Sequence, residues 1–225
     1  MTALIPNDPE SLEHTARAIG FIVKGVPGLR DAIYETIGLV WTDPIMRRRR
    51  IKNLKHEFEM AEEILKGQKR LDDVSAKVAK EVLEPAMEED REELQKLWAA
   101  LLARLLTGQL SSVRPEWIEI IKSLEEIDVA VLQVMPKITY VVTVGVDTQV
   151  KSFLNEIKLL WPSAEFAEDD VYFSFSALKK LGLIQKSNST IEGRSNIVGS
   201  VSRTQMDYTL LGRKILQITS PPNVD

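Results

Sequence analysis

The sequence predicts a mainly α-helical protein in which an N-terminal multi-helix region precedes a smaller C-terminal part that adds a short β-hairpin to its helices. Apolar residues recur at spacings of three and four along most of the chain, as on helices that bury one face. Prolines and glycines separate these stretches. The last quarter differs, because two short apolar segments there flank a polar stretch. We expect three regions, 1–42, 43–135 and 136–225.

The N-terminal region holds the longest apolar stretch, residues 18–41. Charged residues interrupt it at Lys24, Arg30, Asp31 and Glu35. A Gly-Val-Pro-Gly run at 25–28 breaks it in the middle, so it does not predict an ordinary transmembrane helix. We predict two short helices joined by a hinge, which either pack on a core or lie on a bilayer surface.

The next helix is predicted from Asp43–Pro44 to about Gly67 and carries a strongly basic cluster. Asp43 before Pro44 has the arrangement of an N-cap followed by a first-turn proline. An apolar stripe follows: Ile51, Leu54, Phe58, Ala61 and Leu65. The basic residues that we take as candidate contacts are Arg47, Arg48, Arg49, Arg50 and Lys52. They form either a solvated surface or a contact for an anion such as a phospholipid headgroup or a nucleic-acid phosphate.

Further helices are predicted over 71–83, ended by Pro85, and then up to Gly108. The second should carry an acidic run in its first turns, where negative charge suits the helix dipole: Glu88, Glu89, Asp90, Glu92 and Glu93. Consecutive carboxylates do not converge on a metal ion, so we expect no metal site. Pro115 should start another helix, and Ser123 with Glu126 has the spacing of a capping box for a helix that runs to Met135.

We expect a core built from the apolar faces of these helices. Its predicted members are Leu54, Phe58, Leu94, Leu97, Trp98, Leu101, Trp117 and Ile121.

The C-terminal part has the pattern of a winged helix-turn-helix. Residues 138–146 are rich in β-branched side chains and form either a strand or a buried helical turn. Helices over 148–160 and 169–181 come next, followed by a strand at 183–185. The polar stretch 186–205 would be the wing, before a second strand at 206–210 and a closing helix at 211–218. Candidate nucleic-acid contacts are Lys179, Lys180, Lys186, Arg194 and Arg203.

Composition and missing motifs argue against catalysis. The chain has no cysteine, two histidines and a formal net charge of −4. It lacks the P-loop, the nucleophile elbow, the zinc-protease pair and the dinucleotide fingerprint. We therefore expect no enzymatic activity and no cofactor. Its start shows no basic region before an apolar run, which favours a cytoplasmic protein, with peripheral attachment to the inner membrane as the alternative.

Three stretches together resemble the bacterial abortive-infection alpha family. They are Ile-Gly-Leu-Val-Trp-Thr-Asp at 37–43 with the basic helix 47–55, Glu-Glu-Leu-Gln-Lys-Leu-Trp-Ala-Ala-Leu-Leu-Ala at 92–103 with 115–124, and Leu-Lys-Lys-Leu-Gly-Leu-Ile at 178–184 with 208–213. The match in order and spacing covers about residues 35–218. The resemblance implies defence against phage, in which an infected cell stops growing or dies before phage matures. It brings no catalytic residue with it.

Two functions follow as hypotheses. The first is an anti-phage protein that acts by binding, either to a protein partner or phage component or at a membrane. The alternative is a nucleic-acid-binding regulator that works through the winged helix. Wide apolar helix faces also permit a homo-oligomer.

Overall fold

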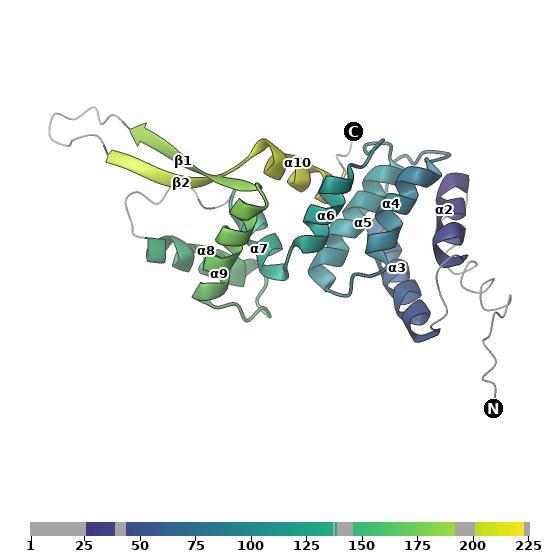
Figure 1. Ribbon diagram of the computed structural model, residues 1–225, viewed down its shortest axis with the longest axis horizontal. Helices are drawn as coiled ribbons and strands as arrows, with labels where there is room; N and C mark the ends of the chain where they lie inside the picture. Colours follow the sequence, from purple (N-terminus) through teal and green to yellow (C-terminus); the bar gives the residue numbers. More distant parts are fainter. Residues whose placement is uncertain (1–25, 39–43, 137, 139–145, 192–200, 223–225) are drawn as a thin grey trace. The chain divides into compact units, whose positions relative to one another are not determined.

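The computed structural model describes residues 26–38, 44–136, 138, 146–191 and 201–222 (Figure 1). Over these ranges the chain is mostly helical, with one antiparallel hairpin near the C-terminus, so the predicted fold class is confirmed. The described residues group into two compact units, the first within residues 1–123 and 218–225 and the second within residues 124–217. The predicted division at 42/43 and 135/136 stays a prediction.

Unit 1 consists of five described helices and a C-terminal segment. The helices are α2 (Pro27–Gly38), α3 (Pro44–Ile64), α4 (Ala76–Ala86), α5 (Glu92–Leu106) and α6 (Pro115–Ser123). Of the two helices expected in 18–41, α2 accounts for the second, and the first lies outside the described residues. The predicted starts at Pro44 and Pro115 are confirmed.

Helix α5 is the centre of unit 1, since nearly all of its side chains are buried. Helix α3 packs on it and buries the predicted stripe at Leu54, Phe58, Ala61 and Leu65. Trp98 of α5 is 0% exposed and is the largest fully buried side chain described. Burying apolar surface of this kind is the main favourable term in folding. The helix ends at Leu106, and Gly108 follows with a φ of 76°, as predicted for its stop.

The other predicted core residues are also buried, with the exception of Trp117. Trp117 is half-buried, and the guanidinium carbon of Arg114 lies 5.8 Å from its ring centroid. Its placement in the core was wrong, because the buried face of α6 is formed by Ile118 and Ile121.

Helix α4 starts later than predicted and includes the residue expected to end it. It begins at Ala76 rather than Leu71, and Pro85 lies inside its last turn. Asp73 explains the late start, because its carboxylate accepts the backbone N–H groups of Val74 and Gly28, both at 2.8 Å. Such a local side-chain bond competes with helix formation. A Cβ at Gly28 would come within 1.8 Å of the Val74 carbonyl oxygen, so glycine is what lets α2 approach this segment.

The C-terminal segment is held on unit 1 by Arg104 of α5. Its Nε donates to the carbonyl oxygen of Ser220 at 2.8 Å, and Nη2 donates to that of Pro221 at 2.9 Å. Nη1 donates to the side-chain oxygen of Gln109 at 3.0 Å. Burial lowers the pKa of Arg104, and the three acceptors satisfy a cation that would otherwise be costly to bury.

Unit 2 contains α7 (Glu126–Val134), α8 (Val146–Leu160), α9 (Glu168–Lys180), β1 (Ile184–Ile191) and β2 (Val201–Tyr208). Helix α10 (Leu210–Thr219) begins in unit 2, and its last residues are grouped with unit 1. The strands pair from Ile184 opposite Tyr208 to Ile191 opposite Val201. They extend further into the predicted wing 186–205 than expected, because an antiparallel ladder is made by backbone groups and accepts polar side chains. Residues 192–200 lie outside the described residues, as does most of 138–146.

Helix α7 has a different cap from the one expected. Glu125 is its N-cap, and the Glu125 N–H donates to Asp128 Oδ2 at 2.9 Å. Ser123 instead ends α6, with its Oγ donating to the carbonyl oxygen of Ile120 at 2.7 Å. The predicted Ser123–Glu126 capping box is wrong, because Ser123 is still part of α6 and its hydroxyl bonds backwards to that helix.

Unit 2 follows the expected order of three helices and a hairpin, and its assignment as a winged helix stays a prediction. In the part of the chain that the structure describes, we find no helix long and apolar enough to cross a membrane.

Replacing Trp98 with alanine should destabilise the protein by about 3–5 kcal/mol, the usual cost of removing a fully buried aromatic ring. Urea unfolding followed by circular dichroism measures this change. Trp117→Ala is the matched control, since this half-buried ring should cost less. Equal losses in the two variants would contradict the central position of α5.

Candidate functional site

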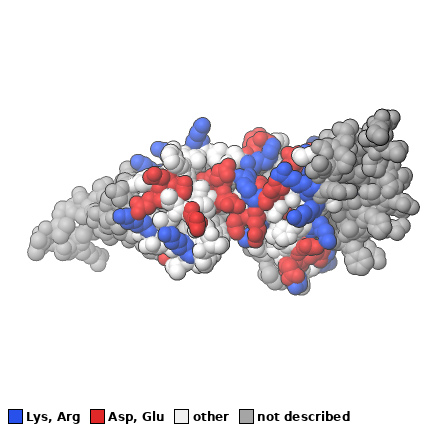
Figure 2. Space-filling model, turned by 90° about the horizontal axis from the view of Figure 1, so that it is seen from below, with Lys and Arg blue, Asp and Glu red and all other residues white. Residues whose placement is uncertain are grey.

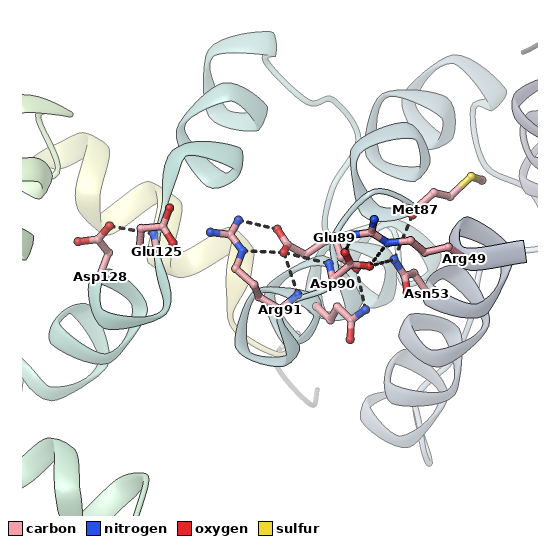
Figure 3. A network of polar contacts seen from close by, with 9 residues as sticks. Arg49, Asn53, Met87, Glu89, Asp90, Arg91, Glu125 and Asp128 are labelled. Carbon is pink, nitrogen blue, oxygen red and sulfur yellow. Dashed lines mark hydrogen bonds and ion pairs between the residues drawn. The ribbon is translucent and has the colours of Figure 1, made fainter. Parts of the chain in front are cut away.

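Helix α3 is joined to the segment 87–91, between α4 and α5, by a group of polar contacts that we call the α3 clasp (Figure 3). Arg49 Nε donates to Asp90 Oδ1 at 2.7 Å, and Arg50 forms an ion pair with Glu88. Asn53 Nδ2 donates to Asp90 Oδ1 at 2.9 Å and to the carbonyl oxygen of Met87 at 3.3 Å. Residues 49, 50 and 53 share one face of α3, so a single edge of the helix is held by the segment.

The acidic residues that were expected in the first turns of α5 make three different kinds of contact. Only Glu92 and Glu93 lie in the first turn of α5, where they complement its dipole. Glu88 and Asp90 precede the helix and pair with α3. Placing these residues in the helix was wrong, because the arginines of α3 and the turn at 87–91 use their carboxylates instead.

Glu89 makes the third kind of contact: it is buried and accepts hydrogen bonds within the segment 87–91. Its Oε1 accepts the backbone N–H groups of Asp90 at 3.1 Å and Arg91 at 3.0 Å. The Arg91 guanidinium donates to both of its oxygens, at 2.8 and 2.9 Å. Gln95 of α5 donates its side-chain amide to the Glu89 carbonyl oxygen at 2.7 Å. The turn is therefore fixed around one carboxylate, and this fixes where Glu88 and Asp90 stand.

Glu57 lies one turn after Asn53 on α3 and is fully buried. Both of its carboxyl oxygens lack a hydrogen-bond partner among the described residues. Burial raises the pKa of Glu57 well above its usual range, and the nearby carboxylate of Glu89 raises it further. Both effects favour the neutral, protonated acid. A titratable group thus occupies a position in the apolar stripe of α3, between Leu54 and Phe58.

The predicted basic contacts of α3 are partly used inside the protein. Arg49 and Arg50 pair with Asp90 and Glu88, whereas Lys52 is exposed. Arg47 and Arg48 belong to α3, but their side chains lie outside the described residues. Figure 2 shows acidic and basic side chains interspersed on the face that it presents. An anion that binds Arg49 or Arg50 must therefore compete with carboxylates already in place.

The predicted nucleic-acid contacts lie on α9 and the hairpin of unit 2. Lys179 and Lys180 are exposed at the end of α9, and Lys186 is exposed on β1. Arg203 belongs to β2 with its side chain outside the described residues, as the whole of Arg194 is. The structure thus brings the three described lysines to neighbouring elements.

The rest of α9 is less suited to a recognition helix. Its first turn carries Glu168, Asp169 and Asp170, and Phe173 in the next turn is 73% exposed. The N-terminal residues of a recognition helix contact base edges, close to phosphates that repel carboxylates.

A feature that the sequence analysis missed is a groove between α4 and α6. It is a pocket of about 330 Å³ lined by Glu81, Glu84, Pro85, Glu88, Pro115, Ile118, Glu119 and Lys122. A second pocket of about 370 Å³ shares Pro85, Glu88 and Lys122 with it and continues onto the 89–91 segment. Glutamates at 81, 84 and 88 follow helical spacing, which is the sequence signal for this face. Its meeting with α6 depends on tertiary packing.

Among the described residues, Asp128 of unit 2 is a second buried carboxyl group with a raised pKa. Burial is the main cause, and the residue acts as the capping side chain of α7. Over the described ranges, no group of three or more potential metal-ligating side chains comes together.

The stability of the protein should fall as pH rises from about 4.3, the ordinary pKa of glutamate. Since the folded-state pKa of Glu57 is raised, the folded state binds more protons than the unfolded chain in this range, and stability is lost as the pH approaches the folded-state value. Glu57→Gln should flatten this slope. Urea midpoints measured at several pH values for this variant, the parent and the exposed-site control Glu59→Gln give the comparison, and an unchanged slope in Glu57→Gln would refute the assignment.

Comparison with known proteins identifies a family but no individual similar protein. Neither the curated proteins nor the solved structures provide a match to this chain. The family model described as Abortive infection alpha matches residues 46–219. This range runs from the first turn of α3 to the end of α10 and covers every helix and strand described here except α2. Because the match spans most of the chain, the protein belongs to the abortive infection alpha family.

Proposed function

We propose that this chain serves abortive infection by binding a protein partner rather than by catalysis, with the groove between α4 and α6 as the contact surface. Membership of the family indicates the defence role. The observation that carries the binding proposal is the chemistry of the groove, which is lined by four glutamates together with Pro85, Pro115 and Ile118. Such a surface suits a basic protein segment, from a phage component or from the host, that also carries apolar side chains.

Two glutamates of the groove form weak ion pairs that a partner could replace. Glu84 lies 3.7 Å from Lys80, and Glu119 lies 3.0 Å from Lys122, both within one helix. Exposed pairs of this kind contribute only about 0–1 kcal/mol each, so a partner's lysine or arginine can replace them at little cost. Ile118 lines the groove and is buried, so an inserted side chain would find apolar contact there.

The perturbed carboxyl groups support binding over catalysis. Strongly shifted pKa values often mark active sites, but a catalytic group must also reach its substrate. Glu57 is closed within the α3–α5 interface, and Asp128 caps α7. Each has a structural position that accounts for its shift.

Neutralising the groove should abolish phage protection. The variant Glu81→Gln with Glu84→Gln removes two carboxylates from the groove, and Glu165→Gln with Glu168→Gln removes two exposed carboxylates outside the groove and α3 as the matched control. Cells that express each form are challenged with phage, and plaque counts and culture survival are followed together. Full protection by the groove variant, at equal protein level and helicity, would sink the proposal.

A second candidate is supported by the exposed lysines of α9 and β1. If unit 2 binds nucleic acid, duplex DNA should shift in a gel and the shift should weaken steeply between low and moderate salt, because phosphate contacts release counterions. Lys179→Gln with Lys180→Gln should then reduce affinity, and Lys151→Gln with Lys158→Gln on α8 is the charge-matched control. The absence of a shift at low salt would exclude this candidate, and equal effects of the two pairs would assign the binding to net charge.

A further inference from the structure

We propose that α3 is a releasable helix, which detaches from α5 as a unit and then binds an anionic lipid surface through its basic first half. The proposal concerns a different element from the groove and does not depend on it. It rests on how α3 is held, on what interrupts its buried face, and on what its detachment would uncover.

Two sets of contacts hold α3. The apolar set is the stripe at Leu54, Phe58, Ala61 and Leu65, which packs chiefly on α5. The polar set is the clasp, and it is surface-exposed in part: the side chains of Arg49 and Asp90 are 52% and 40% exposed. Partly exposed ion pairs contribute little. The attachment of α3 therefore depends on its apolar face.

Glu57 interrupts that apolar face. It follows Leu54 by three residues and lies one turn before Ala61, so it faces α5 with the stripe, and it is 0% exposed. Both oxygens lack partners among the described residues, and so does the indole N–H of Trp98 on α5. Arg91, a cation of the adjoining segment, is bound to Glu89. Water would satisfy Glu57 as soon as α3 moved away, so the docked state carries a penalty that the detached state lacks.

A glutamate at the centre of a helix–helix interface breaks the pattern that the rest of the stripe obeys. Positions where a chain departs from good local packing without a compensating contact tend to be functional. Glu57 lowers the stability of α3 relative to the rest of the core. Segments of low local stability are the ones that open while the rest of a protein stays folded.

Detachment changes what α3 offers to its surroundings. In the docked state, Arg49 and Arg50 are paired with Asp90 and Glu88. Once released, they join Arg47, Arg48 and Lys52 on a helix whose apolar residues are also freed. A basic helix with an apolar stripe is the form that binds membrane interfaces, and each basic side chain near an anionic surface raises binding about fivefold. The glutamates at 59, 62 and 63 confine this surface to the first half of α3.

Hydrogen exchange tests release directly. In the full chain, the amides of α3 should exchange faster than those of α5. Glu57→Leu should slow exchange in α3 by about fivefold to a hundredfold, the factor set by relieving an unpaired buried polar group, and leave α5 unchanged. Glu57→Gln is the second variant in case leucine distorts the interface, and it should act in the same direction with a smaller effect. Equal exchange rates in α3 and α5 of the parent protein would overturn the proposal.

Vesicle binding tests the second part of the proposal, that the released α3 binds an anionic lipid surface. The probe is vesicles of equal parts phosphatidylglycerol and phosphatidylcholine, with phosphatidylcholine alone for comparison. Glu88→Gln with Asp90→Asn opens the clasp and should increase co-sedimentation, whereas Glu57→Leu should decrease it. Glu168→Gln with Asp169→Asn removes two carboxylates from α9, outside α3 and the clasp, so it corrects for net charge. Lipid contact does not involve release of α3 if Glu57→Leu leaves vesicle binding unchanged. The same conclusion follows if binding rises equally in the clasp variant and in its charge-matched control.

Discussion

The packing of α3 against α5 is the contact on which the candidate site of unit 1 depends. It buries Phe58 and Trp98 in one core and brings the start of α3 beside the turn at 87–91. The buried Glu89 fixes that turn, so Arg49 and Arg50 meet acceptors whose positions are already determined. The same packing closes Glu57 away from water. One interface thus buries the apolar stripe of α3 and encloses a carboxyl group that has no hydrogen-bond partner among the described residues.

Local signals allowed much of the fold to be predicted from the sequence. Pro44 and Pro115 start helices because a proline at the first helical position gives up no hydrogen bond. The stripe of α3 and the buried face of α5 follow from apolar spacing alone. Errors arose where a sequence pattern had more than one structural outcome. Ser123 was predicted to cap α7, whereas Glu125 is the N-cap and Ser123 donates to the carbonyl oxygen of Ile120 at the end of α6.

Predicting the candidate site was harder, because a run of charged residues in the sequence does not indicate which residues it will pair with in the fold. The arginines at 47–50 and the acidic run at 88–93 were each recognised, but as separate features: a surface cluster and a helix-dipole effect. Their pairing depends on a contact between residues about 40 positions apart, which no local pattern encodes. The groove was missed for the same reason. Glu57 is a further case, since a glutamate within an amphipathic helix ordinarily lies on its exposed side.

Glu88 connects the groove with the α3 clasp. Its carboxylate lines the groove between α4 and α6, and it is also the partner of Arg50. A basic segment that binds the groove and takes Glu88 as its acceptor removes one of the contacts that hold α3. By the reciprocity of linked equilibria, a partner that loosens α3 must itself bind more tightly when α3 is already free. Loss of the Glu88 contact would remove one polar contact of α3, and the apolar stripe would still hold the helix against α5. A partner in the groove and Arg50 would therefore compete for the Glu88 carboxylate.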